Sequence, residues 1–511
     1  MLMSARFSHL CILSGRKRVH CSKEENMAHK SIAKDVMWKF LERFGCLGVQ
    51  FVLQIVLGRI LGTALYGELS FMIIFTTLAN VFVQKGFNTA LIQNKDVDEE
   101  DYSSVFWVSI AIAAVLYGVL FAGAPFLSRF FKMPHIVAPF RVLALMLFPG
   151  ALNSIQVAKI SRKMDFKKLF FSHVGAILFS GCLGIVIAVN GGGLWALVAQ
   201  SLSNITVTCI MMIFFVKVRI KRVCNMQRIK VLFGFGWKVL VSSLIDTIYQ
   251  DLRSLVIGKQ YDSSTLGCYN KGKHFPQFIN NAVNGTLQSV MLPVMSKKQD
   301  DSVQLKAMMR NSIKLSAYVM FPVMAGLAAT ATPLVDLLLT EKWLPCVPYL
   351  RIYCFTFAFY PVNTCNLQAI NAIGRSDIFL KLEVIKKVYG VIALIIAMTC
   401  FHSPIAIAMT GAITTILGCF VNAFPNKKLI GYSYFEQMKD MLPSFVMAVI
   451  MLAGVLLMQL LGLSSVVTLL VQVLTGVIIY LVLSVIFKPA GFTMLKDIIC
   501  NLLKKKRPAK A

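Results

Sequence analysis

The sequence predicts an all-α integral membrane protein with about fourteen transmembrane helices. Of its 511 residues, 57% are hydrophobic and 15% are charged, whereas soluble domains carry about 25% charged residues. Apolar runs recur along the chain at a length close to the ~20 residues that cross about 30 Å of hydrocarbon. Alternate loops between these runs also differ in their content of basic residues, which is typical of multi-pass membrane proteins.

The apolar runs set the expected elements in chain order. We expect helices at about 36–58, 66–88, 104–127, 138–159, 169–190, 194–216, 231–257, 266–294, 313–337, 346–371, 382–401, 404–424, 443–462 and 466–487. The turn formers "NGGG" (190–193) and "HSP" (402–404) predict tight hairpins. Pro149, Pro276 and Pro361 fall inside expected helices, where neighbouring helices can satisfy the freed backbone groups.

The net charge of +29 is explained by topology and not by nucleic-acid binding. With the N-terminus in the cytoplasm, the outer loops hold only Arg59, Arg129, Lys132, Lys259 and Lys342. The inner loops hold many more, for example in "KVRIKRVCNMQRIK" (217–230). This asymmetry predicts cytoplasmic N- and C-termini. The basic tail "KKKRPAK" (504–510) can then meet anionic lipid on the inner side.

The thirteen cysteines mostly fall in expected helices and form no CxxC pair, so we interpret them as small apolar residues. The N-terminal stretch 1–30 is basic and has no signal-peptide pattern. We expect it to be a cytoplasmic tail. That translation begins at Met27, so that the first residues are not native, is a further hypothesis.

One half of the chain resembles the other. "VLGRILGTALYG" (56–67) matches "VIGKQYDSSTLG" (256–267), each with one cation after an apolar run. Further along, "FPGALNSIQVAKISRKMD" (148–165) matches "YPVNTCNLQAINAIGRSD" (360–377). Two six-helix units that insert the same way up would be related by an axis along the membrane normal. The predicted organisation is a tail (1–30), an N-lobe (31–218), a C-lobe (219–428), an extra helix pair (429–488) and a basic tail (489–511).

Polar residues at helical spacing form stripes on the first two helices of each repeat. The expected cavity residues are Arg43, Gln50, Asn80, Gln84, Gln250, Arg253, Lys273, Gln277, Asn280, Asn284 and Arg351, with Asp246 and Asp251 as candidates for ion coupling. One alternative is that the amides only join helices by hydrogen bonds. Charges are harder to explain in this way, because burying one in the bilayer costs at least about 2.5 kcal/mol. The sequence therefore favours a hydrated cleft between the lobes. Lys271, near a helix end, is the cation that we expect to extend to the interface.

Cations together with amides suit an anionic, hydroxyl-rich ligand. Arginine binds phosphate oxygens in pairs, lysine acts as a point charge, and Asn or Gln can pair with sugar hydroxyls. No catalytic, metal-binding or nucleotide-binding motif is evident, so the sequence indicates a carrier and not an enzyme. It predicts no cofactor beyond possible coupling to H⁺ or Na⁺.

The paired repeats, the added helix pair and the corner "LGRILGTALYGELSF" (57–71) resemble the Wzx-type polysaccharide flippases. The similarity is to the colanic-acid and teichuronic-acid exporter branch of the MOP superfamily, over about residues 31–488. It includes an inner turn with Gln368, Arg375 and Asp377. The resemblance implies a MATE-like fold in the bacterial inner membrane and alternating access. It also implies a central cavity lined by helices 1, 2, 7 and 8. A protein of this family is expected to move undecaprenyl-pyrophosphate-linked oligosaccharide from the cytoplasmic to the periplasmic leaflet.

On this hypothesis, Arg43, Arg253, Lys273 and Arg351 attract pyrophosphate, and the amides pair with sugar. Expected partners are the lipid-linked oligosaccharide, the bilayer and other polysaccharide-assembly proteins. A multidrug or lipid II exporter of the same superfamily is the nearest alternative. An integral-membrane glycosyltransferase or polymerase and a structural scaffold are alternatives of other classes. The outer loops are short for a separate catalytic face, and a scaffold would have no accessible cleft.

Overall fold

The computed structural model describes Trp38 and residues 45–93, 97–163, 166–216, 220–223, 225–299, 301–462 and 464–505. Within these ranges the chain is helical and contains no strand. The first described helix is Gly45–Ile60. The described residues pack into two compact units. Unit 1 contains those within 1–54, 75–126 and 137–245, and unit 2 contains those within 55–74, 127–136 and 246–511.

The helices α2 to α8 follow the first helix in chain order. They are α2 (Thr63–Gln93), α3 (Glu99–Phe130), η1 (Pro134–Ile136), α4 (Val137–Ala144), α5 (Leu147–Lys163), α6 (Phe166–Val189), α7 (Leu194–Phe215) and α8 (Met226–Gln260). Within unit 1, α6 and α7 form an antiparallel hairpin, and α7 also packs against α4 and α5. A small apolar core joins α2, α3 and α5 through Ala79, Val83, Ala113, Leu147 and Ala151.

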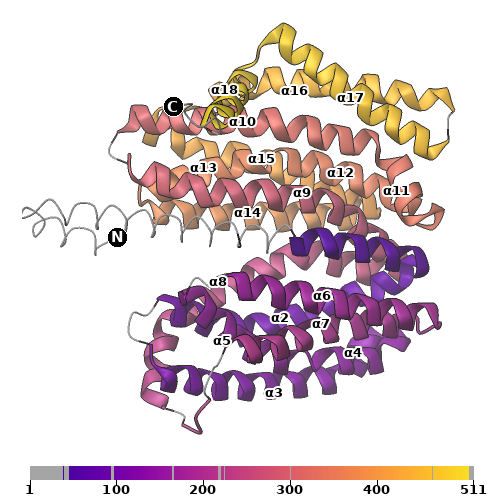
Figure 1. The fold of residues 1–511 in the computed structure, drawn as a ribbon, viewed down its shortest axis with the longest axis vertical. Coiled ribbons are helices and arrows are strands. Elements are labelled where there is room, and N and C mark those ends of the chain that lie inside the picture. The colour runs from indigo at the N-terminus through magenta and orange to yellow at the C-terminus, as the bar shows by residue number, and fades with distance from the viewer. Residues whose placement is uncertain are drawn as a thin grey trace, which may run out of the picture. The chain divides into compact units, whose positions relative to one another are not determined.

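The remaining helices lie in unit 2. They are α9 (Ser263–Ser296), α10 (Ser302–Ala329), α11 (Ala331–Leu339), η2 (Glu341–Cys346), α12 (Val347–Ala358), α13 (Tyr360–Ala372), α14 (Ser376–Ile396), η3 (Ala397–Phe401), α15 (Pro404–Ile430), α16 (Tyr434–Leu457), η4 (Met458–Leu461), α17 (Ser465–Phe487) and α18 (Ala490–Lys505). Here α9 packs against α12 and α13, and α10 packs against α16 (Figure 1). These helices run side by side along most of their length.

Ten described helices are long and apolar enough to cross a membrane, or eleven if the bent α8 is one span. The prediction of an all-α, multi-pass membrane protein is confirmed, while the count of fourteen stays a prediction. The expected span 346–371 is divided at Phe359 into α12 and α13, with Pro361 in the first turn of α13. The expected span 313–337 is likewise divided at Thr330 into α10 and α11.

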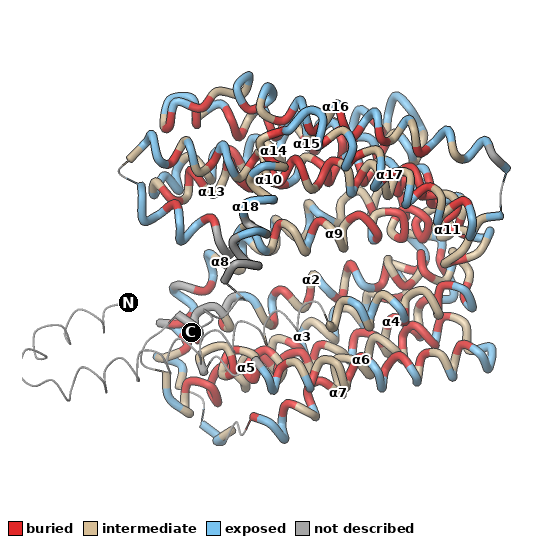
Figure 2. The backbone as a smooth tube through the Cα atoms, turned by 45° about the horizontal axis from the view of Figure 1, so that its top comes forward, coloured by how far each residue is buried: buried red, intermediate tan, exposed pale blue. Residues whose placement is uncertain are grey.

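Exposed side chains on the outer helices are mostly large and apolar. On α17, Leu470, Leu474 and Ile478 are each more than half exposed. On α14, Val388 and Ile392 are similarly exposed, and Figure 2 shows exposed positions recurring along these helices. Soluble monomers rarely present such a wide apolar surface, so these faces are suited to contact lipid.

Both expected hairpins are present. Gly191 and Gly193 have positive φ between α6 and α7, where glycine meets no Cβ penalty. His402 takes the left-handed conformation and Pro404 begins α15, which is a favoured position for proline.

The two matching cations at the ends of the first helices of the repeats each cap another helix within unit 2. The Arg59 guanidinium donates to the carbonyl oxygens of Leu337 and Leu338 (Nε to Leu338 O, 2.8 Å) at the end of α11. Lys259 Nζ donates to the carbonyl oxygen of Phe130 at 2.5 Å, at the end of α3. A cation at a helix C-terminus satisfies unpaired carbonyls and complements the helix dipole. Arg59 and Lys259, which are equivalent in the two repeats, therefore both cap the C-terminus of another helix.

Lys271 does not extend to the interface as the sequence suggested. Only 6% of it is exposed. Its ammonium group lies 4.5 Å from the ring centre of Tyr66 and 5.4 Å from that of Trp343. Two aromatic faces thus attract the cation inside the corner, which compensates in part for its lost hydration.

The segment between the repeats is fixed to α3 within unit 1. The backbone N–H groups of Lys221 and Asn225 donate to the hydroxyls of Ser103 (2.9 Å) and Ser104 (3.0 Å). Arg228 forms an ion pair with Asp98 at 2.5 Å. This hydrogen-bonded ion pair lowers the pKa of the Asp98 carboxyl to about 2.

The C-terminal basic segment contains a helix, α18, that packs on α10. A Cβ at Gly491 would lie 2.9 Å from the carbonyl oxygen of Lys314, so only glycine permits this approach. Phe492 and Leu495 pack against the apolar cluster around Tyr318. The end of the tail, 506–511, lies outside the described residues.

Candidate functional site

A polar cavity of about 470 Å³ lies within unit 2. Four polar residues of α8 line it: Asp246, Tyr249, Gln250 and Arg253. Their spacing of i, i+3, i+4 and i+7 places them on one face of the helix. The neighbouring apolar positions Ile245 and Ile248 are nearly half exposed, so the polar and apolar residues of α8 lie on different faces.

The helix α9 supplies a second polar wall. Its lining residues are Lys273, Gln277, Asn280, Asn281 and Gln288. Asn284 lies one turn from Asn280 and donates from Nδ2 to its Oδ1 at 2.5 Å. Asn284 does not itself line the cavity, so its contact with Asn280 orients a lining amide.

The other walls come from α12, α13, α14 and α15. They provide Tyr353, Thr356, Phe357, Tyr360, Asn363, Thr364, Leu367, Glu383, Lys386, Lys387, Tyr389, Gly411, Thr414, Thr415 and Gly418. Hydroxyl, amide and charged groups outnumber apolar ones in this set. Because α14 and α15 are themselves apolar enough to span a membrane, the cavity places polar groups among helices of a hydrophobic bundle.

Arg253 is held by two threonines of α15. Its Nε donates to Thr410 Oγ1 at 2.9 Å, and its Nη2 donates to Thr414 Oγ1 at 3.2 Å. Each threonine hydroxyl donates in turn to a backbone carbonyl of its own helix, Thr410 to Ile407 and Thr414 to Gly411. The hydroxyl oxygens are therefore oriented as acceptors, and the guanidinium is fixed without being neutralised.

Two ion pairs lie in the wall of the cavity. Lys387 donates to Asp246, which joins α14 to α8. Lys386 donates to Glu383 one turn away. Across the described part of the chain, Arg253 and Lys273 make no ion pair within 4.0 Å. The cavity thus holds four cations against two carboxylates, and its excess charge is positive.

A glycine allows Tyr249 to enter the cavity wall. A Cβ on Gly390 of α14 would lie 1.9 Å from the Tyr249 hydroxyl oxygen. Any larger residue would therefore displace the ring. Tyr249 in turn lies beside Arg253, whose guanidinium carbon is 5.8 Å from the ring centre.

Residues 56–348 of the chain match the model of a family described as polysaccharide biosynthesis protein. That match covers more than half of the sequence. The chain belongs to this family.

Three curated relatives of this polysaccharide biosynthesis protein support the assignment. The teichuronic acid biosynthesis protein TuaB of Bacillus subtilis is 24% identical over 68% of this chain and 73% of its own. The succinoglycan biosynthesis transport protein ExoT of Rhizobium meliloti is 22% identical over 81% and 82%. The lipopolysaccharide biosynthesis protein WzxC of Escherichia coli is 23% identical over 80% and 81%.

Solved structures share the fold of this polysaccharide biosynthesis protein. The lipid II flippase MurJ in an inward closed conformation aligns with a TM-score of 0.70 and 16% identity, over 89% of this chain and 98% of MurJ. An inward-facing multidrug transporter of the MATE family, within the MOP superfamily, aligns with a TM-score of 0.59 and 15% identity, over 76% and 98%. The expected MATE-like fold is confirmed.

The structure brings together six of the residues expected to act on substrate or ions: Gln250, Arg253, Lys273, Gln277, Asn280 and Asp246. Asp251 does not line the cavity, although it interacts electrostatically with Lys273. Arg351 does not line it either. On α12 it is two positions from Tyr353, a turn of about 200°, and it therefore points away from the cavity that Tyr353 lines.

Of the expected residues of the N-terminal repeat, Gln50, Asn80 and Gln84 lie in unit 1. Asn80 Oδ1 accepts a hydrogen bond from Gln84 Nε2 at 3.0 Å, and both side chains are close to Gly150. Gln50 is exposed, and Arg43 lies outside the described residues. That these residues and those of unit 2 line one cleft stays a prediction.

The charged residues that α14 contributes to the cavity were not predicted from the sequence. Glu383, Lys386 and Lys387 fall in "LEVIKKVYG", inside a span that was correctly expected to be apolar. The same rule that singled out Arg253, that charges within spans need a hydrated or paired environment, applies to them. Across the described residues there is also no group of three His, Cys, Asp or Glu side chains that could hold a metal ion.

Proposed function

We propose that this protein is a flippase that carries undecaprenyl-pyrophosphate-linked oligosaccharide across the bacterial inner membrane by alternating access. Its termini would be cytoplasmic, and its product would be used to build a surface polysaccharide. It would act as a carrier and not as an enzyme. Other polysaccharide-assembly proteins would be its partners.

The observation that carries the proposal is the excess positive charge in the cavity of unit 2. Arg253 is oriented by Thr410 and Thr414 but paired with no carboxylate in the described residues. A guanidinium without a carboxylate partner inside the cavity is stabilised when an anion binds to it. A pyrophosphate offers several oxygens that can accept hydrogen bonds from its planar N–H donors. Lys273 on the facing helix α9 would add a second charge.

The remaining lining suits the sugar part of the substrate. Gln250, Gln277 and Asn280 carry both donors and acceptors, as sugar hydroxyls do. Tyr353 and Tyr360 add aromatic surface and a hydroxyl each. A transporter for lipophilic cations would instead favour unpaired acidic or aromatic walls. The charge balance therefore favours a polysaccharide precursor over a cationic drug.

The ion pair of Asp246 with Lys387 is the candidate for coupling to an ion gradient. It joins α8 to α14, so breaking it would release two helices that line the cavity. Carboxylates inside membranes are frequent proton relays. We propose that binding of H⁺ or Na⁺ at Asp246 competes with Lys387 during the transport cycle.

The proposal is tested by complementation of a bacterial strain that lacks its own oligosaccharide flippase. Arg253→Ala should abolish surface polymer while the protein stays in the membrane, and lipid-linked oligosaccharide should accumulate on the inner leaflet. Lys428→Ala, which removes an exposed cation at the end of α15, is the matched control and should complement fully. Normal polymer with Arg253→Ala would exclude this residue from the site. Drug resistance without complementation by the unaltered protein would favour the multidrug alternative.

A further inference from the structure

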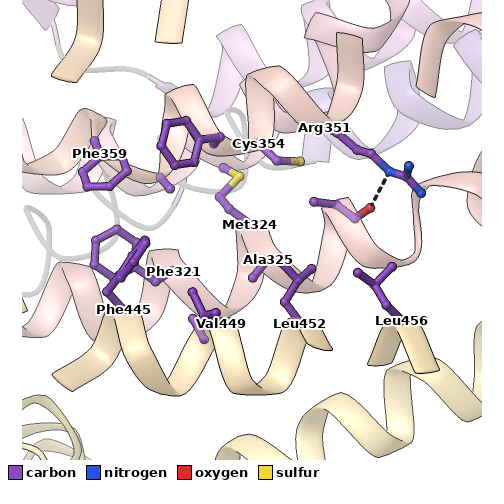
Figure 3. A pocket seen from close by; sticks show the side chains of 14 residues that line it. Phe321, Met324, Ala325, Arg351, Cys354, Phe359, Phe445, Val449, Leu452 and Leu456 are labelled. Atoms are coloured by element: carbon purple, nitrogen blue, oxygen red, sulfur yellow. Dashed lines mark hydrogen bonds between the residues drawn. The ribbon is translucent and has the colours of Figure 1, made fainter. Parts of the chain in front are cut away.

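A second cavity, of about 420 Å³, lies in unit 2 between α10, α12 and α16 (Figure 3). Its lining is apolar apart from one residue, Arg351. Phe321, Phe359 and Phe445 gather at one end, with Phe321 5.2 Å from Phe359 and 5.5 Å from Phe445 between ring centres. Arg351 lies at the other end, beside Leu456. We refer to this cavity as the aromatic groove.

The aromatic groove opens at the molecular surface. Phe355 is 42% exposed, Val449 45% and Leu456 38%, whereas Met324 and Cys354 form a buried floor. The flanking helices α10 and α16 are both long and apolar enough to span a membrane. The opening is therefore directed toward the hydrocarbon of the bilayer, where an acyl chain and not water is available to fill it.

Arg351 is positioned as an anion-binding group at the mouth of the groove. Its Nε donates to the carbonyl oxygen of Ala328 at 3.2 Å, and its Nη2 donates to Thr332 Oγ1 at 3.3 Å. Both partners are neutral, and no carboxylate lies within 4.0 Å of Arg351 in the described part of the chain. A guanidinium has five N–H donors, so donors remain for an external oxygen. The side chain is also exposed.

We propose that the aromatic groove binds one anionic phospholipid, with its phosphate at Arg351 and one acyl chain extending to the three phenylalanines. Arg351 on α12 and Phe359, which directly follows its last residue, are eight positions apart, which corresponds to about 12 Å along a helix. Half of the hydrocarbon core is about 15 Å thick. The groove thus matches the depth of one leaflet, with its cation at the level of the headgroups. Arg351 lies in the second turn of α12, which follows η2, on the side that the charge distribution places outside.

The groove is separate from the polar cavity of the proposed function. The two share no lining residue, although α12 contributes to both. Tyr353 and Thr356 face the polar cavity, while Cys354 and Phe355 face the groove. A substrate whose pyrophosphate lies at Arg253 would have to pass its tail through α12 to reach the groove. A polyprenyl tail is also much longer than the groove. Both points favour a bilayer phospholipid as the occupant.

The test is native mass spectrometry of the full-length protein with phosphatidylglycerol or phosphatidylcholine. The unaltered protein should retain one phosphatidylglycerol in preference to phosphatidylcholine. Arg351→Gln should reduce this retention by about tenfold, because it removes a charge-assisted hydrogen bond. Lys342→Gln removes an exposed cation near the same membrane surface, outside the groove, and should have no effect.

A second variant tests the apolar part independently. Ala325→Phe fills the groove midway and leaves Arg351 in place, so it should also prevent retention. Retention by Arg351→Gln or by Ala325→Phe equal to that of the unaltered protein would overturn the proposal. Displacement of phosphatidylglycerol by a polyprenyl phosphate would assign the groove to the tail of the substrate instead, and would likewise overturn it.

Discussion

Gly67 of α2 and Gly267 of α9 pack directly against each other's helices at equivalent positions of the two repeats. A Cβ on Gly67 would lie 1.8 Å from the carbonyl oxygen of Ser263, and one on Gly267 would lie 2.0 Å from that of Thr63. Beside them, the hydroxyls of Thr63 and Ser264 form a hydrogen bond of 2.5 Å. Glycine at both positions permits a helix contact that no other residue would allow.

Gly67→Ala should therefore open this contact. Overpacking of a close helix contact costs about 1–3 kcal/mol, and a Cβ against a backbone carbonyl has little room to adjust. The measurement is disulfide formation between Thr63→Cys and Ser264→Cys, which should be rapid with Gly67 and slow with Gly67→Ala. Gly62→Ala is the control, because a Cβ there meets nothing within 4 Å. Equal cross-linking in all three backgrounds would contradict the contact.

Gly390→Ala should disturb the polar cavity through Tyr249. The added Cβ would displace the phenol, whose hydroxyl oxygen would be 1.9 Å away. In Tyr249→Phe that oxygen is absent and the nearest ring carbon is 2.9 Å away, so the double variant should recover part of the lost transport. The measurement is a double-mutant cycle on polysaccharide export. Strictly additive effects would mean that the two residues do not act through this contact.

Variants of Asp246 and Lys387 can show whether their ion pair has a structural role or couples ion binding to transport. Because the pair is only partly buried, removing one partner should destabilise the protein modestly, and removing both should be less harmful. We expect Asp246→Asn to lower thermal stability and Asp246→Asn with Lys387→Gln to restore it. If Asp246 couples ion binding to transport, the double variant should be stable and inactive. A stable, active double variant would exclude the coupling role.

The ion pair of Asp98 with Arg228 predicts a pH dependence at the segment between the repeats. The pKa of Asp98 is lowered from its ordinary value of 3.8 to about 2. A carboxyl with a lowered pKa stabilises the folded contact above its ordinary pKa and loses that effect as the pH falls toward 2. Hydrogen exchange at the N–H groups of Lys221 and Asn225, corrected for intrinsic rates, should therefore accelerate below about pH 4.

Asp98→Asn should remove this pH dependence and accelerate exchange at neutral pH. The substitution keeps an oxygen that can accept from the backbone N–H groups of Glu100 and Asp101 at the start of α3. It therefore isolates the charge. Glu99→Gln, which removes a neighbouring carboxylate that makes no ion pair in the described residues, is the control. Unchanged exchange in Asp98→Asn would contradict the account.

The polar faces of α8 and α9 could be predicted because the polar residues of each helix lie on one uninterrupted helical stretch, which in α8 is the part after its bend. Arg253 and Gln277 followed from spacing alone. The position of Arg351 could not be predicted in the same way. Which cavity a residue of α12 faces depends on how the helix is rotated relative to its neighbours, and the sequence does not give this rotation. The expected span is also divided at Phe359. The pairing of Lys387 with Asp246 joins helices distant in sequence, which only tertiary packing defines.

The most direct measurement of the central claim is the reaction of a cavity cysteine with charged, membrane-impermeant thiol reagents. Thr415 lines the polar cavity, whereas Ile413 on the same helix is 48% exposed on an apolar face. In a background without reactive native cysteines, Thr415→Cys should react faster with an anionic methanethiosulfonate than with a cationic one. Arg253→Gln should reduce that preference, and Ile413→Cys should react with neither. No reaction at Thr415→Cys, or equal rates with both reagents, would contradict a hydrated, positively charged cavity.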